Sequence, residues 1–541
     1  MRLGTNAGLS VGPDKVTGMA RIAVIGAGMG AMAAAARLAV AGHRVVVYER
    51  GRTHGGGVGL FERDGFRFDT GPGLLRLPAV YRDLFVKTGK ETLEQTVRLT
   101  QVDPAVRHLF ADGTDVALPN ASRAGVLQAL DGAFGAGAGE RWSDLVNRAR
   151  EAWDATRRPL LEEPLRTDWR VLGSDPYPAA APARRGWFGG LFARGGGRPR
   201  VPALAEVARR ELADPRAAAL LESHALAHGL DPRTAPASAT VLPYLEQTFG
   251  TWYVGGGMRA LADALYERCG KRKVEFCFEA EVTGIVEKDG RAAGVELADG
   301  TVAEADAVVA GIDPALLPAL LGGQEPWREG EDVTPGPGPG AGPPGRLTVF
   351  LALRGGRPDD AVHRTVVHAP DREAELTAVF GAEGDGGARE PCPRPTVTVL
   401  RPDDPAIRPD DDHEAVTLSA VVARHGPVDW TGGEAAAQGA DRLITAAEAA
   451  IPGLRDRILW REVRTPCDIA ADTGVAGGSV PGPALAGAEG RYLRPANLTR
   501  LPGLYLAGGW SHPGGGLAHA GMSGALVAGL IVEGQDWRGS Q

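Results

Sequence analysis

Residues 21–31 read RIAVIGAGMGA, and residues 32–49 continue MAAAARLAVAGHRVVVYE. The apolar, β-branched run RIAVI predicts a strand, the glycines after it predict a tight turn, and the alanine-rich segment from Met32 to Ala41 predicts a helix. A second predicted strand, RVVVY, is followed by Glu49, which comes 23 residues after Gly26. This order and spacing are typical of the first unit of a dinucleotide-binding Rossmann fold.

Each residue type in this unit has a physical role in holding a dinucleotide. Gly26 permits the sharp turn, Gly28 lets the backbone approach a pyrophosphate, and Ala31 is small enough for close packing of the helix on the strand. The free N–H groups at the start of the helix would face the phosphates. Glu49 can accept hydrogen bonds from a ribose diol, but the unit alone does not choose between NAD and FAD. The residues of this unit expected to contact the cofactor are Gly26, Gly28, Met29, Gly30, Ala31, Glu49 and Arg50.

The composition favours a small molecule over a nucleic acid as the partner. The 541 residues include 59 basic and 67 acidic side chains, a net charge of −8, and they contain no long basic run. No window approaches the roughly 18 consecutive apolar residues of a membrane span. The cysteines form no CxxC pair, which argues against a zinc site, a disulfide framework or a thioredoxin-like motif and fits a reducing cytoplasm. They are Cys269, Cys277, Cys392 and Cys467.

Two segments have the composition of a leader and a linker. Residues 1–19 contain no apolar stretch long enough for a signal peptide, so they are predicted to be a dispensable leader, with Met1 or Met19 as the start. Residues 331–346 read EDVTPGPGPGAGPPGR and cannot bury a core, which predicts a solvated linker.

Further glycine-rich blocks extend the pattern over most of the chain. They are, in order, GGG at 55–57, DGFRFDTGP at 64–72, TWYVGGGM at 251–258, RPAN at 494–497, GLYLAGG at 503–509 and HPGGG at 512–516. Together with the first unit, these blocks resemble those of the bacterial phytoene desaturase family, which lies within the FAD-dependent amine-oxidase-like oxidoreductases. The resemblance runs from Arg21 to Glu533 and is weakest between about residues 116 and 241.

The resemblance implies an α/β fold with two interleaved parts. A Rossmann-like FAD-binding domain would be assembled from residues 20–107, 250–320 and 458–541, and an α+β substrate domain from residues 108–249 and 321–457. Within the second domain, apolar runs at Leu347–Leu353, Thr396–Leu400 and Ala415–Val422 predict strands that floor a cavity. Helical patterns between Leu204 and Leu245 could roof it.

The resemblance also implies FAD as the cofactor and extends the set of contact residues. The strand that Val282 opens would meet the adenine, and residues 281–309 alternate as in a β-meander. A helix over Ala518–Val532 would direct its N-terminus at the pyrimidine edge of the flavin and stabilise the charge that reduction places there. The further residues expected at the cofactor are Gly56, Gly57, Gly71, Pro72, Val282, Gly508, Gly509, Gly515, Gly516 and Leu517.

One position departs from the family. Relatives usually carry an arginine where this chain has Gly57, and losing that charge-assisted contact to the cofactor would weaken FAD binding by roughly 1.5 to 3 kcal/mol. Arg52 either substitutes for it or is an ordinary exposed loop arginine. His512, beside the glycine turn, is a candidate acid-base group, or it shapes the backbone together with Pro513. No metal site is predicted.

The sequence near residue 190 has features of a membrane-contacting loop. Trp187, Phe188 and Phe192 are flanked by arginines, so the loop could dip into a membrane surface and admit a lipid-soluble substrate. The alternative is a disordered or core-capping insertion. The expected location is therefore the cytoplasm, with peripheral contact to the inner face of the membrane if the first interpretation holds.

The resemblance implies that a large apolar substrate, such as a carotenoid or related natural product, loses a hydride to FAD and a proton from the neighbouring carbon, which forms a double bond. Dioxygen or a quinone would reoxidise the cofactor. The alternatives are a redox-neutral polyene isomerase, an amine oxidase and a non-catalytic apolar-ligand-binding protein. The sequence does not distinguish among substrates, electron acceptors or oligomeric states.

Overall fold

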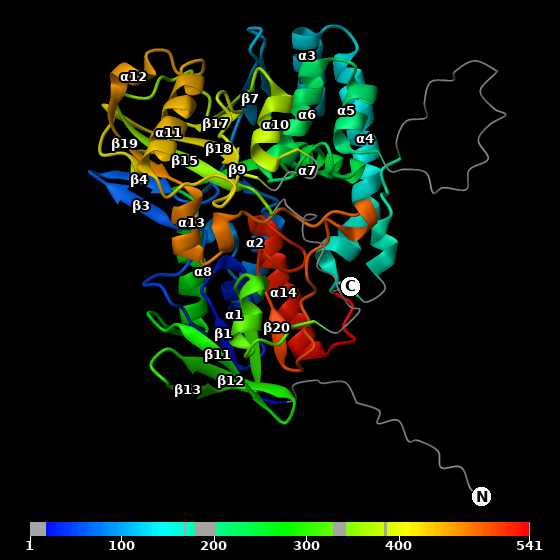
Figure 1. The fold of residues 1–541 in the computed structure, drawn as a ribbon, viewed down its shortest axis with the longest axis vertical. Coiled ribbons are helices and arrows are strands. Elements are labelled where there is room, and N and C mark those ends of the chain that lie inside the picture. The colour runs from blue at the N-terminus through cyan, green and yellow to red at the C-terminus, as the bar shows by residue number, and fades with distance from the viewer. Residues whose placement is uncertain (1–17, 167–168, 179–201, 328–341, 383–386, 540–541) are drawn as a thin grey trace, which may run out of the picture.

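The computed structural model describes residues 18–166, 169–178, 202–327, 342–382 and 387–539. A five-stranded parallel sheet in the order β10-β2-β1-β14-β20 lies at the centre of the lower half of the molecule in Figure 1. Its strands are β1 (Arg21–Ile25), β2 (Arg44–Tyr48), β10 (Glu275–Cys277), β14 (Ala307–Ala310) and β20 (Leu504–Leu506). The two strands predicted from the first unit are confirmed at their predicted bounds, and parallel pairing buries β1 between β2 and β14.

Helices cover one face of this sheet. They are α1 (Met29–Val40), α2 (Ala79–Gly89), α8 (Arg259–Lys271) and α14 (Leu517–Glu533). Helix α1 begins three residues before the predicted Met32, directly after Gly28, whose extended backbone (φ −73°, ψ 167°) ends the turn. It crosses α14 at very short range: a Cβ atom on Gly524 would lie 2.4 Å from the carbonyl oxygen of Gly30.

A three-stranded antiparallel sheet lies against the other side of the parallel sheet. Its strands are β11 (Val282–Lys288), β12 (Arg291–Leu297) and β13 (Val302–Glu304). Ile285 and Val295 pack into one apolar cluster with Ala23, Val308 and Leu504 of the parallel sheet. The predicted meander is therefore confirmed through β13, whereas its last segment, β14, joins the parallel sheet.

The upper left of Figure 1 contains a seven-stranded mixed sheet in the order β19-β15-β18-β17-β16-β7-β8. Its strands are β7 (Val106–Leu109), β8 (Asp115–Leu118), β15 (Gly345–Arg354), β16 (Arg364–Val367), β17 (Val397–Leu400), β18 (His413–Val422) and β19 (Ile458–Arg464). The three strands predicted for this region are confirmed as β15, β17 and β18. Helices α11 (Gly433–Ala447) and α12 (Leu454–Arg457) bury Leu443, Ile444 and Leu454 against the sheet.

Helices occupy the upper right of the molecule (Figure 1). They are α3 (Arg123–Phe134), α4 (Ala138–Arg157), α5 (Leu204–Leu212), α6 (Pro215–Ala227) and α7 (Val241–Phe249), with α10 (Arg372–Phe380) beside them. Trp142, Leu145 and Val207 belong to their common core. The helical interpretation of residues 204–245 is confirmed.

Short strands connect the two halves. Strands β5 (Leu75–Arg76) and β6 (Leu99–Gln101) pair with β9 (Thr251–Val254), and β3 (Leu60–Arg63) forms a hairpin with β4 (Phe66–Asp69). Phe66 and Phe68 of the hairpin pack with Phe350 of the seven-stranded sheet. The remaining short helices are α9 (Leu317–Leu320) and α13 (Pro466–Thr473).

The strand pairing of residues 458–464 changes the predicted boundary between the cofactor domain and the substrate domain. Residues 458–464, which the sequence assigned to the cofactor domain, form β19 and hydrogen-bond along β15 of the seven-stranded sheet.

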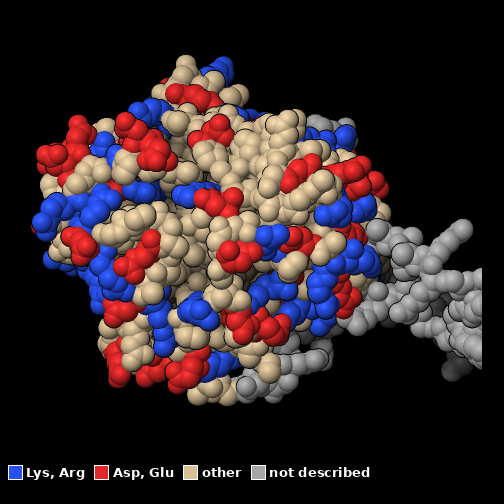
Figure 2. Space-filling model, turned by 90° about the horizontal axis from the view of Figure 1, so that it is seen from above, with Lys and Arg blue, Asp and Glu red and all other residues tan. Residues whose placement is uncertain are grey.

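Among the residues that the structure describes, no helix is long and apolar enough to cross a membrane. Figure 2 shows acidic and basic side chains interspersed over the face seen from above.

Candidate cofactor site and active site

The first glycine turn begins where β1 ends. Gly26 has a φ of +87°, a conformation that L side chains rarely adopt, and its N–H donates to the carbonyl of Tyr48 over 2.8 Å. Gly28 precedes the first residue of α1, and a Cβ atom placed on it would meet no other atom within 4 Å. Ala31 is buried, and a Cβ on Gly311 would lie 2.7 Å from its methyl group. Gly26 and Ala31 match the turn and packing roles expected from the sequence, and Gly28 has the open backbone that an approaching pyrophosphate would need.

Gly30 has a different surrounding. A Cβ on Gly30 would lie 2.7 Å from the Cα of Gly508 and 2.9 Å from the carbonyl oxygen of Ala520. Gly30 therefore brings α1 against the C-terminal glycine turn and α14. It positions the site's walls through packing, whereas Gly28 leaves its backbone open.

Glu49 is fixed at the end of β2 by its own carboxylate. Oε2 accepts from the N–H of Ala27 over 2.8 Å, and Oε1 accepts from the N–H of Gly51 over 2.7 Å. The N–H of Ala280 donates to the carbonyl of Glu49 over 2.9 Å, which brings the start of β11 at Val282 to this end of the sheet. The structure thus brings together Glu49 and the segment expected at the adenine.

The second glycine loop lies directly against the first. The N–H of Gly55 donates to the carbonyl of Ala27 over 2.8 Å, and a Cβ on Gly56 would lie 3.0 Å from the Cα of Gly28. A Cβ on Gly71 would lie 2.0 Å from the carbonyl oxygen of Gly57, so only glycine fits there. Gly57 itself has room, because a Cβ on it would meet nothing within 4 Å.

A buried arginine holds this loop from behind. In Arg259, at the start of α8, Nη1 donates to the carbonyl of His54 over 2.7 Å and Nη2 donates to Oγ1 of Thr53 over 2.9 Å. Its Nε donates to Asp263 over 2.7 Å. The His54 ring stacks on Tyr266 with ring centroids 4.1 Å apart. The guanidinium is therefore occupied by hydrogen bonds to the loop and to Asp263.

Asp69 anchors the N-terminal end of the same helix. Its carboxylate accepts from the N–H groups of Met258 and Arg259 over 2.7 and 2.9 Å. Burial raises the pKa of Asp69 to about 6, although these backbone donors lower it in part. A pocket lined by Asp69, Gly71 and Tyr253, among others, lies where the hairpin meets the seven-stranded sheet.

The C-terminal glycine turn follows β20. Gly508 has a φ of +115°, its N–H donates to Oγ of Ser523 over 3.0 Å, and a Cβ on it would meet nothing within 4 Å. A Cβ on Gly515 would lie 1.8 Å from the carbonyl oxygen of Pro481, whereas Gly516 is exposed and precedes α14. The predicted C-terminal helix is confirmed as α14.

Asn497 holds this turn in place. Its buried Nδ2 donates to the carbonyls of Leu506 and His512 over 3.0 and 2.9 Å and to Oγ of Ser523 over 3.2 Å. Strand β20, the turn and α14 are thereby joined through one amide. Asn497 ends the block RPAN, but the sequence assigned it no role.

His512 is enclosed by the protein. Its side chain is 0% exposed, and its Nε2 lies 2.9 Å from the carbonyl oxygen of Glu163. Burial lowers its pKa to about 4, so the ring is neutral at physiological pH. This placement favours the backbone-shaping alternative over contact with a substrate.

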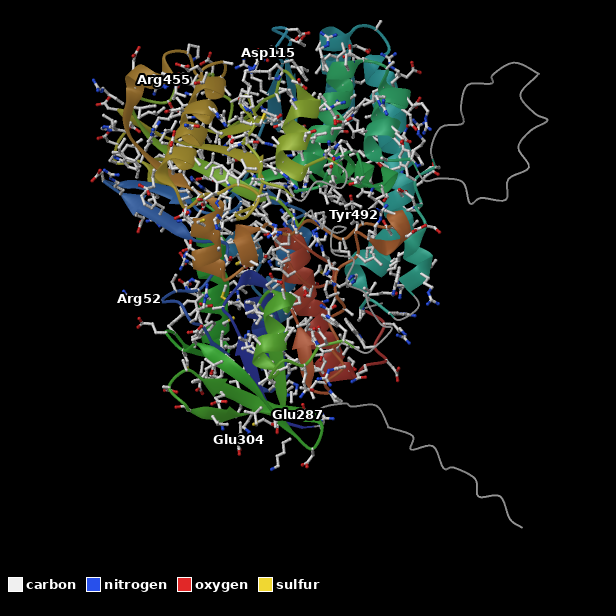
Figure 3. All side chains as sticks on the ribbon, viewed as in Figure 1. Arg52, Asp115, Glu287, Glu304, Arg455 and Tyr492 are labelled. Carbon is white, nitrogen blue, oxygen red and sulfur yellow. The ribbon has the colours of Figure 1, made fainter. Side chains whose placement is uncertain are left out.

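Two arginines near the first unit point away from the glycine loops. Arg52 is 89% exposed and pairs with Glu279 over 2.9 Å. Figure 3 shows it at the edge of the molecule. Arg50 donates from Nη2 to the carbonyl of Ala471 over 2.8 Å. Arg52 is thus the exposed loop arginine that the sequence allowed for, and it does not substitute for the missing side chain at position 57.

The chemistry of the residues that meet here fits FAD. The backbones of Gly28, Gly57 and Gly508 come from three distant segments, and each faces space in which a Cβ would touch nothing within 4 Å. Helices α1 and α14 both begin at this site, after Gly28 and Gly516, with no side chain capping their first N–H groups. Such helix starts stabilise phosphate oxygens and the negative charge of a reduced flavin.

Comparison with known proteins identifies the family. Over residues 32–329, more than half of the chain, the sequence matches the family described as flavin containing amine oxidoreductase. The chain belongs to this family. It is an FAD-dependent oxidoreductase, and FAD is its cofactor.

Several known proteins resemble the chain along nearly its whole length. It is 28% identical over 518 residues to the 4,4'-diapolycopene oxygenase of a Methylomonas species, covering 95% of this chain and 98% of that protein. It is 30% identical over 522 residues to the hydroxyneurosporene desaturase of Cereibacter sphaeroides, covering 95% and 97%. An oxidoreductase from Methanosarcina mazei shares its fold, with a TM-score of 0.61, 17% identity and coverage of 94% and 99%.

Some residues of the site were missed by reasoning from the sequence. Arg259 directly follows the block TWYVGGGM, so a search for a basic side chain next to that block would have found it. Tyr81, whose buried hydroxyl donates to the carbonyl of Leu517 over 3.0 Å, carries no motif that marks it. Trp187, Phe188 and Phe192 lie outside the described residues.

Proposed function

We propose that this flavoenzyme desaturates a polyene of the carotenoid type. The observation that carries the proposal is similarity over 95% of the chain to proteins named for hydroxyneurosporene desaturation and phytoene desaturation. A long conjugated or pre-conjugated chain would lie with one C–C bond over the flavin ring. The substrate would lose two hydrogens, one as hydride to the cofactor and one as a proton released to solvent, and a C=C bond would form.

When bound, FAD supplies the two-electron acceptor for the hydride. We propose that the glycine-walled site holds it through Gly26, Gly28, Met29, Ala31, Glu49, Gly56, Gly57, Gly71, Pro72, Val282, Gly508, Gly509, Gly515, Gly516 and Leu517. Gly30 acts there through helix packing. The start of α14 would stabilise negative charge on the cofactor's ring.

The division into domains is revised in this proposal. Because β19 pairs with β15, we place the start of the third cofactor-domain segment after Arg464 in place of residue 458. The second substrate-domain segment is extended to residues 321–464, and the segments 20–107 and 250–320 for the cofactor and 108–249 for the substrate are kept. We propose that dioxygen or a quinone reoxidises the reduced cofactor. We also propose that Trp187, Phe188 and Phe192 contact the inner face of the membrane.

Mass spectrometry of the product tests this function. The purified, FAD-loaded protein is incubated with neurosporene, hydroxyneurosporene or phytoene in liposomes, with a quinone and then with air. The proposal expects a product lighter by two hydrogens. An unchanged mass with a changed isomer would establish the isomerase alternative, and peroxide release with amines alone would establish the amine oxidase.

A second candidate reaction is oxygen insertion, favoured by the similarity to the 4,4'-diapolycopene oxygenase. It predicts a product that gains oxygen only in air. Binding of polyenes with no turnover under any condition would contradict both reactions and leave an apolar-ligand-binding protein.

A further inference from the structure

A buried tyrosine joins α2 to the first residue of α14. Tyr81, on α2, is 0% exposed, and its hydroxyl donates to the carbonyl of Leu517 over 3.0 Å. Burial raises the pKa of Tyr81, so the hydroxyl keeps its proton and remains a donor at physiological pH. The hydrogen bond therefore fixes the start of α14 relative to α2.

Helix α2 is itself held by two other helices of the cofactor half. Nη2 of Arg37, on α1, donates to Asp83 of α2 over 2.7 Å. The guanidinium of Arg268, on α8, lies over the ring of Phe85 of α2, with its Cζ atom 5.0 Å from the ring centroid. The helix that carries Tyr81 is thus fixed from two sides, and its hydroxyl is a preorganised donor.

A glycine on α14 lets the two helices pack closely around this hydroxyl. A Cβ atom on Gly521 would lie 3.0 Å from Cγ1 of Val80 and 3.4 Å from Cζ of Tyr81. Val80 and Ala518 belong to one buried apolar cluster. The beginning of α14 therefore rests directly on the beginning of α2.

The carbonyl that Tyr81 binds belongs to the peptide unit between the first two residues of α14. The other end of this unit is the N–H of Ala518, and no side chain caps the first N–H groups of the helix. Hydrogen bonds in a chain polarise one another, so a donor on the carbonyl of Leu517 makes the N–H of Ala518 a stronger donor. Tyr81 thereby acts on the free end of the helix as well as on its position.

The two segments that Tyr81 joins both reach the proposed cofactor site. Gly71 and Pro72, which precede α2 in the chain, are exposed, and so is Gly516, which precedes α14. A Cβ atom on Gly508 would meet nothing within 4 Å. Burial lowers the pKa of His519, in the first turn of α14, to about 4, so this side chain is neutral. The positive end at this site is therefore that of the helix backbone.

We propose that Tyr81 is a positioning residue that raises the reduction potential of bound FAD by fixing and polarising the first peptide unit of α14. The inference rests on the cofactor placement proposed above. A hydride carries two electrons and one proton to the flavin and leaves one negative charge on it. N–H groups that are fixed and polarised at the start of α14 stabilise this charge and favour the reduced form.

The reduction potential of Tyr81→Phe tests the proposal. The variant keeps the buried ring and loses the hydroxyl, and the carbonyl of Leu517 keeps its helical partner four residues later. The FAD-loaded protein is reduced anaerobically by xanthine and xanthine oxidase beside a reference dye, and absorbance gives the ratio of reduced to oxidised FAD. At equal dye ratio this ratio should fall at least about threefold, as loss of one hydrogen bond allows. For a two-electron couple that is about 14 mV.

A second replacement reverses the expected sign. Putting 3-fluorotyrosine at position 81 makes the hydroxyl more acidic and therefore a stronger donor, so the ratio of reduced to oxidised FAD should rise. The proposal stands only if the two replacements shift the potential in opposite directions. Shifts of the same sign would overturn it, because they would indicate disturbed packing of α2 on α14.

Tyr177→Phe is the matched control, because Tyr177 is 6% exposed and its hydroxyl donates to Glu211 over 2.6 Å in the helical part of the molecule. It should lower the melting temperature and leave the potential unchanged. An unchanged or higher potential in Tyr81→Phe would overturn the proposal, even with a lower melting temperature. Equal shifts in Tyr81→Phe and Tyr177→Phe would also overturn it, since any loss of stability would then reach the flavin.

The outcomes separate this inference from the desaturase function. The electrons in the test come from xanthine, so a protein that oxidises no polyene still gives a potential, and the role of Tyr81 is measured independently. Turnover of a polyene together with an unchanged potential in Tyr81→Phe would contradict the role of Tyr81 alone.

Discussion

At the residue scale, one glycine has a clear effect on cofactor affinity. Gly57 lies in the second glycine loop, and a side chain there would meet no protein atom within 4 Å. Its φ is not in the left-handed region, so an L residue fits the backbone. The surrounding structure therefore has room for an arginine at position 57, although the sequence carries glycine there.

The variant Gly57→Arg should bind FAD more tightly. One charge-assisted contact is worth roughly 1.5 to 3 kcal/mol, which corresponds to a dissociation constant lower by roughly ten- to a hundredfold. Titration of the apoprotein with FAD, followed by flavin fluorescence, measures the change. Gly433→Arg is the control for added charge, because Gly433 is exposed, its φ is not in the left-handed region and a Cβ there would also meet nothing within 4 Å. An unchanged or weaker affinity in Gly57→Arg would show that the loop does not face the phosphates.

Arg259 acts on the same loop from the protein side, through the carbonyl of His54 and the hydroxyl of Thr53. Arg259→Gln should raise the dissociation constant of FAD by about tenfold or more, because a net loss of one or two hydrogen bonds frees the loop. Arg259→Lys should recover part of the affinity. The apoprotein's melting temperature is measured beside it. If melting falls while FAD affinity stays the same, Arg259 supports the fold only.

At the element scale, the crossing of α1 and α14 holds the two glycine turns together. Gly30 and Gly524 let the helices approach so closely that a Cβ on Gly524 would lie 2.8 Å from the Cβ of Ala33. The site's two walls, one after Gly28 and one after Gly508, are placed by this contact.

Gly524→Ala should lower the free energy of unfolding by roughly 1 to 3 kcal/mol, as overpacking of a tight contact does. Gly132→Ala is the matched control, because Gly132 is also inside a helix and a Cβ there would meet nothing within 4 Å. That control should be neutral or stabilising by up to about 1 kcal/mol. Thermal unfolding of both variants measures the difference, and equal effects would argue against the close crossing.

At the scale of the whole molecule, buried titratable groups make stability depend on pH in two opposing ways. Burial lowers the pKa of His363 to about 4, so only the unfolded chain takes up this proton as the pH falls through 6.5. Burial raises the pKa of Glu375 to about 7, so the folded chain takes up this proton first. Histidines whose pKa is lowered by burial, such as His363, therefore make the fold less stable as the pH falls. Glu375 makes the fold more stable as the pH falls.

Two variants should separate these contributions. His363→Gln should make the drop in melting temperature from pH 7 to pH 5 smaller, and Glu375→Gln should make it larger. A single group contributes at most about 1.4 kcal/mol per pH unit. Differential scanning calorimetry of the FAD-loaded protein at both pH values measures the drop. Shifts of the same sign in both variants would contradict the protonation states assigned here.

The sequence predicted local features better than distant partners. The first strand, the turn at Gly26 and the second strand follow from short-range pattern, and they are confirmed. The pairing of β19 with β15 joins residues more than a hundred positions apart, and no periodicity reports such a partner. Arg259 acquires its role only through folding, because its partners His54 and Thr53 lie on another segment.

The measurement that tests the account most directly is anaerobic mixing of the FAD-loaded protein with a polyene substrate, monitored in the visible. The account predicts that the flavin absorption bleaches while a polyene with one more conjugated double bond appears, in equal amounts. A flavin that stays oxidised while the polyene is unchanged, or is only isomerised, would contradict it.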